Sequence, residues 1–150
     1  MMDKKIEEVV NEQLNTELWS CNLYIAFQVY FEKQELPVLA LWLKNQRQKK
    51  ADRIQKLTTY LLGEDAFVSI RGFEYKADKW QSPALNSLFE HEQYFHKQVN
   101  DFMNFARYMG DDALQALVLD LYTDEVHVSD FLVELLRMLV KEWRRQLPLE

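Results

Sequence analysis

Glycine and proline are scarce in this chain, with only three of each among 150 residues. A sandwich or barrel of short strands needs many tight turns, and tight turns draw heavily on both residue types. Apolar residues instead recur at helical spacing along almost the whole chain. We therefore predict an all-α fold of a few long helices, organised as a single domain over residues 1–150.

Turn and cap signals divide the apolar pattern into four predicted helices. They span residues 3–33, 37–62, 83–109 and 111–146. Pro37 suits the first turn of a helix, where its missing N–H costs nothing. Gly63 and Gly110 are suitable helix stops, and the acids Asp111 and Asp112 suit the positive end of a helix dipole.

The lengths of the connections predict how these helices are arranged. The first two helices are joined by a short link, as are the last two, so each pair should be antiparallel. The second and third are joined by about 20 residues, Gly63 to Ser82. A connection of that length can run the length of a bundle and make the two helices parallel. We predict a four-helix bundle of two antiparallel hairpins joined by a long crossover.

Composition excludes several classes of protein. The net charge of −6 and pI of about 5.1 argue against a nucleic-acid partner, which would require a basic face. A single cysteine, Cys21, leaves no internal disulfide framework. The charged N-terminus lacks the apolar region of a secretory signal, and no apolar stretch reaches 18 residues. We expect a cytoplasmic protein with no membrane partner.

Two acids interrupt apolar rows at the middle of their helices. Glu17 lies in the row Val10, Leu14, Glu17, Cys21, Tyr24, Gln28. Glu92 lies in the row Leu85, Leu88, Phe89, Glu92, Phe95, Val99, Phe102. A carboxylate is rarely buried without a partner, so two at mid-height predict one shared polar site inside the bundle. For either acid alone, a small roll of the helix into solvent is an equally good interpretation.

The second helix offers cations in place of further acids. Its inner row runs through Leu43, Arg47, Lys50, Ile54, Leu57 and Leu61. Lys50 should therefore point inward, with Arg53 nearby, whereas Lys44 and Lys49 fit a solvated face. A protonated lysine or arginine has no lone pair with which to ligate a metal.

Other residues permit two interpretations each. Tyr24 could reach the site of Glu17 or be an ordinary core tyrosine. His127 reads better as a surface or packing histidine than as a ligand. His91 and His96 flank Glu92, and the role of all three histidines, including an external metal site, stays open at this point.

Four segments in register resemble bacterial non-haem ferritins over residues 5–146. They are NEQLNTEL at 11–18 with NLY at 22–24, LTTYL at 57–61, EHEQ at 90–93, and YTDEVH at 122–127. The resemblance implies a ferritin-like bundle, a hollow shell that stores iron, and a di-iron ferroxidase centre in each subunit. It also implies iron as the bound metal and a homo-oligomeric shell of 24 subunits or a mixed shell with active subunits.

The resemblance further implies that this centre is degraded. Glu17 and Glu92 match two of its ligands, Tyr24 its nearby tyrosine, and Glu125 a ligand of an accessory third site. Replacements stand at the other positions: Lys50 for the bridging glutamate, Arg53 for the histidine, Val126 for a glutamine, Ser129 for a glutamate, and Lys49 and Val128 at the accessory site.

These departures lead to one structural and two functional hypotheses. Lys50 and Arg53 would pair with Glu17 and Glu92 and supply the positive charge that iron would have brought. The chain would be an iron-storage subunit with impaired or absent ferroxidase activity; the alternative is a metal-free structural or interaction module derived from a ferritin. Since the sequence ends at Glu150, we expect no fifth helix, which leaves shell closure open.

Overall fold

The computed structural model describes residues 2–72 and 84–146, and it contains four long α-helices there. They are α1 (Lys4–Lys33), α2 (Pro37–Gly63), α3 (Ala84–Met109) and α4 (Asp112–Gln146). The predicted all-α bundle is confirmed, and each predicted boundary falls within one residue of the observed one. No helix among these residues is both long and apolar enough to cross a membrane.

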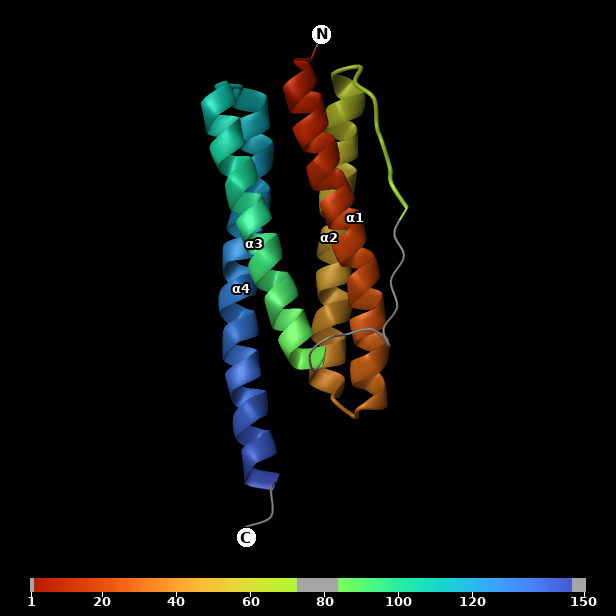
Figure 1. The fold of residues 1–150 in the computed structure, drawn as a ribbon, viewed down its shortest axis with the longest axis vertical. Coiled ribbons are helices and arrows are strands. Elements are labelled where there is room, and N and C mark those ends of the chain that lie inside the picture. Colours follow the sequence, from red (N-terminus) through yellow and green to blue (C-terminus); the bar gives the residue numbers. More distant parts are fainter. Residues whose placement is uncertain (1, 73–83, 147–150) are drawn as a thin grey trace.

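The directions of the four helices agree with the prediction from the connection lengths. In Figure 1, α1 runs antiparallel to α2, and α3 runs antiparallel to α4. Both α2 and α3 point the same way, so the connection between them returns along the bundle. Its described part, residues 64–72, lies beside α1.

Side-chain caps and left-handed residues set the helix ends. Asp3 accepts a 2.7 Å hydrogen bond from the Lys5 amide, and Asp111 accepts one of 2.9 Å from Leu114. Both bonds satisfy amides that have no partner inside the helix. Gly110 has φ 66°, as expected for a helix stop. Gly63 does not serve that role, because it is the last residue of α2 and Asp65, with φ 57°, makes the turn.

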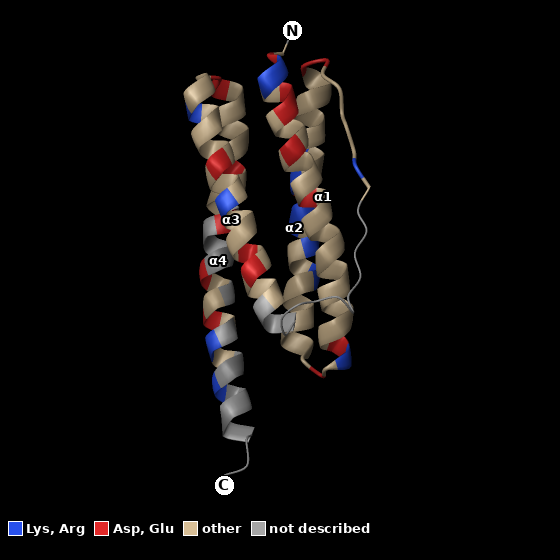
Figure 2. Ribbon diagram, viewed as in Figure 1, with Lys and Arg blue, Asp and Glu red and all other residues tan. Residues whose placement is uncertain are grey.

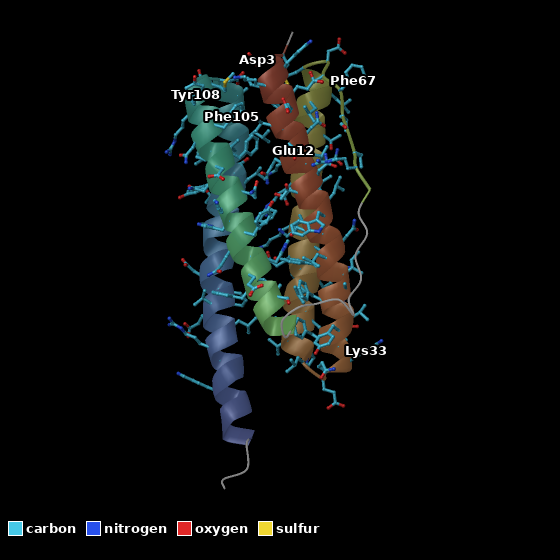
Figure 3. All side chains as sticks on the ribbon, viewed as in Figure 1. Asp3, Glu12, Lys33, Phe67, Phe105 and Tyr108 are labelled. Carbon is cyan, nitrogen blue, oxygen red and sulfur yellow. The ribbon has the colours of Figure 1, made fainter. Side chains whose placement is uncertain are left out.

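Two apolar cores fill the bundle, one toward each end. Figure 3 shows side chains from all four helices filling the space between the ribbons. One core contains Val10, Leu14, Leu57, Leu61, Phe95, Val99, Leu114, Val118 and Leu121. The other contains Leu23, Phe27, Phe31, Leu39, Leu43, Leu88 and Leu135. On every helix these two sets are separated by polar positions, so a polar layer crosses the middle of the bundle.

The observed inner rows differ from two of the predicted ones. Cys21 and Gln28 are half-buried, and the buried face of α1 continues through Phe27 and Phe31. On α2, Arg47 and Ile54 are half-buried; the buried positions between Leu43 and Leu57 are Gln46, Lys50 and Arg53. Each helix is rotated slightly from the orientation predicted by its apolar residues alone, because the polar layer also has to face inward.

Asparagine side chains of α1 hold the first part of the crossover. Asn11 donates to the Phe67 carbonyl and accepts from the Ser69 amide, both at 2.8 Å. Asn15 does the same with the Ser69 carbonyl and the Arg71 amide, again at 2.8 Å. The match is geometric, since four helical residues rise about 6 Å and two extended residues about 6.6 Å. The extended segment is thereby fixed along α1.

Candidate functional site

Five charged side chains meet in the polar layer. Glu17 comes from α1, Lys50 and Arg53 from α2, Glu92 from α3 and Glu125 from α4, and none is more than 2% exposed. Glu17, Glu92 and Glu125 each follow a buried leucine at a step of three or four residues, which keeps them on the inward faces of their helices. Lys50 and Arg53 lie at the same steps within the buried face of α2 that runs from Leu43 to Leu57. Figure 2 shows basic segments midway along α2, with acidic segments on the helices that face them. We call these five residues the central cluster.

Glu17 lies between the two cations of α2. Its Oε2 atom is 4.0 Å from Lys50 Nζ, and its Oε1 atom is 3.8 Å from Arg53 Nη1. Burial raises the pKa of the Glu17 carboxyl, while the charges of Lys50 and then Arg53 act to lower that pKa. The predicted pairing of Glu17 with Lys50 and Arg53 is therefore present in the structure.

Arg53 has a second carboxylate partner on α4. Glu125 Oε2 accepts a hydrogen bond of 3.4 Å from Arg53 Nη1. Sequence reasoning assigned Glu125 only to an accessory site and missed this contact. The helical spacing on α4 could have predicted that Glu125 faces inward. Leu114, Val118 and Leu121 are buried at steps of four and three, and Glu125 follows four residues later.

Glu92 differs from the other two carboxyls of the central cluster. Within the described part of the chain it forms no ion pair and no hydrogen-bond donor reaches either oxygen. Burial raises the pKa of Glu92 well above its usual range, and the neighbouring carboxylates of Glu125 and Glu17 raise that pKa further. The expected pairing of Glu92 with Lys50 and Arg53 is not found among the described residues: Lys50 pairs with Glu17, and Arg53 pairs with Glu17 and Glu125.

Charge counting accounts for the high pKa of Glu92. Three carboxyls face two cations, so the fully ionised cluster would carry one net negative charge in a buried environment. Two carboxylates are acceptors only and cannot hydrogen-bond to each other. A proton on Glu92 makes the cluster neutral and lets Glu92 donate to Glu125.

Aromatic rings surround the ammonium group of Lys50. Its Nζ atom lies 3.5 Å from the ring centroid of Phe95 and 5.0 Å from that of Tyr24. Ring faces attract cations, so these contacts offset part of the cost of burial. Burial nevertheless lowers the pKa of Lys50, and the charge of Glu17 acts in the opposite direction. Tyr24 contacts the predicted site, as one of its two interpretations required.

His91 packs against the same layer without joining the ion pairs. Its Nε2 atom is 2.7 Å from Ser20 Oγ, and its ring lies 4.8 Å from that of Trp19 and 5.7 Å from that of Tyr24. Burial, and then the charge of Lys50, lower the pKa of His91 to about 3. His91 is therefore a neutral, buried residue and does not belong to an external site.

The remaining candidate residues whose side chains are described do not belong to the central cluster. Lys44 and Lys49 are exposed, as predicted for a solvated face, and His96 is half-buried. The side chains of Val126, His127, Val128 and Ser129 lie outside the described part of α4. Their predicted replacement roles therefore stay predictions.

The donor set of the central cluster does not suit a resident di-iron centre. Lys50 and Arg53 offer only N–H groups, and their charged ends lie beside the carboxylate oxygens that would have to ligate. Among the residues that the structure describes, no three His, Cys, Asp or Glu side chains are grouped so as to hold a metal ion. The arrangement instead lets Lys50 and Arg53 neutralise buried carboxylates inside the bundle.

The fold and this layer define a class: four-helix bundles with one long crossover and a cluster of ionisable residues at the centre. The chain belongs to the ferritin family, because the family model described as a ferritin-like domain matches residues 7–141. This family assignment confirms the resemblance found in the sequence.

Known proteins agree with this assignment. The bacterial non-heme ferritin of Bacteroides fragilis is 27% identical over 117 residues, which cover 77% of this chain and 74% of that protein. Among solved structures, a humanized archaeal ferritin has a TM-score of 0.82 at 21% identity, with 96% of this chain and 90% of that chain covered. An open-pore ferritin of the archaeon Archaeoglobus fulgidus has a TM-score of 0.81 at 22% identity, covering 92% and 85%. These structures share the fold.

Proposed function

We propose that this chain is an iron-storage subunit of the ferritin type whose own oxidation of Fe(II) is impaired or absent. One observation carries this proposal: both oxygens of Glu17 face cations of the chain itself. Iron would arrive as cargo and would find the carboxylate oxygens of Glu17 already paired with Lys50 and Arg53. Binding at the centre would therefore require these cations to be displaced, and neither cation can itself ligate a metal.

The resemblance to bacterial ferritins supports storage as the remaining role. Glu17, Glu92 and Tyr24 keep the residue types of the ferroxidase centre, while Lys50 and Arg53 replace two of its ligands. In this proposal oxidation is supplied by other subunits of a mixed shell, or the oxidised iron is deposited inside a shell of 24 copies. A cytoplasmic location stays a prediction from the sequence.

A second candidate function is a metal-free structural or interaction module. The ion pairs of the central cluster favour it, because a bundle that neutralises its own carboxylates needs no metal for stability. Retention of Glu92 without a cation partner argues against it. A module freed from iron has no need to bury an acid that is costly unless protonated.

Aerobic oxidation of Fe(II), measured together with size-exclusion light scattering, tests these proposals. We expect no acceleration above the protein-free rate and an assembled shell that incorporates iron when an active bacterial non-heme ferritin is added as a source of oxidation. Saturable oxidation by the chain alone would refute the proposal. A small oligomer that neither oxidises nor retains iron would favour the interaction module.

A further inference from the structure

We draw no further inference here: the strongest candidate, the outward-facing edge of the extended crossover segment beside α1 with the exposed side chains of Phe67 and Ile70, carries none because nothing in the structure shows what covers it.

Discussion

Glu17 of α1 and Lys50 of α2 face each other inside the bundle, with Glu17 Oε2 4.0 Å from Lys50 Nζ and both side chains almost fully buried. This pair links α1 to α2 within the polar layer that separates the two apolar cores. Breaking one half of a buried pair leaves an uncompensated charge, whereas breaking an exposed pair changes little. Lys50 is therefore the residue at which the stability of the cluster is most directly tested.

We predict that Lys50→Ala lowers the free energy of unfolding by about 3–5 kcal/mol, because Glu17 loses a cation and the packing on Phe95 is lost. Urea unfolding at neutral pH measures the change. Lys49→Ala on the same helix removes an exposed charge and should stay within about 0.5 kcal/mol of the natural protein. A Lys50→Ala variant as stable as this control would contradict the ion-pair hypothesis.

Glu92 should make the protein less stable as pH rises. Its folded-state pKa is raised well above the usual value of 4.5, so between these two values the folded state holds a proton that the unfolded state has released. Stability from this group is fully present below pH 4.5 and falls by on the order of 1 kcal/mol per pH unit above it. Glu92→Gln, which is neutral at every pH, should flatten this decline and raise Tm at pH 8.

The matched control for this measurement is Glu90→Gln, an exposed change on the same helix, which should leave the slope of Tm against pH unaltered. If Glu92→Gln and Glu90→Gln gave the same slope, the proton on Glu92 would be ruled out.

His91 should act in the opposite direction at lower pH. Its folded-state pKa is lowered from 6.5 to about 3, so below pH 6.5 the unfolded state gains a proton that the folded state does not bind. Stability from this group is present above pH 6.5 and is lost progressively as pH falls toward 3. His91→Gln should weaken the loss of stability between pH 6.5 and 4.5, as measured by urea unfolding at each pH.

Urea unfolding of Ser20→Ala over the same pH range separates the effect of the charge on His91 from that of its hydrogen bond to Ser20. Loss of the 2.7 Å contact with His91 should cost about 1 kcal/mol at every pH, without a change of slope. A pH slope unchanged in His91→Gln would show that this histidine titrates normally.

The side-chain hydrogen bonds of Asn11 and Asn15 should slow hydrogen exchange at two amides of the crossover. Asn15→Ala removes the acceptor of the Arg71 amide, and Asn11→Ala removes that of the Ser69 amide. Each variant should exchange the affected amide faster, by at least about tenfold, while Tm changes by only a few degrees. Hydrogen exchange resolved to single residues measures this, with the exposed change Glu8→Ala as control. Equal acceleration at Ser69 in both variants would exclude the residue-by-residue pairing.

Much of the fold was predictable because it depends on local signals. The period of the apolar residues, Pro37, Gly110 and Asp111 set the helix boundaries through short-range geometry. The lengths of the connections predicted the helix directions. The helical spacing of the inner residues predicted that Glu17, Lys50 and Glu92 point toward one interior layer.

The tertiary structure alone decided which of these side chains are partners. Sequence period fixes the face of a helix only to within a fraction of a turn, and it says nothing of the stagger or rotation of one helix against another. Packing of the two apolar cores sets both, and it brings Arg53 to Glu125 while leaving Glu92 without a cation. The sequence by itself determined that charged residues of both signs meet inside the bundle. Three-dimensional packing determined which carboxyls pair with cations and which one does not.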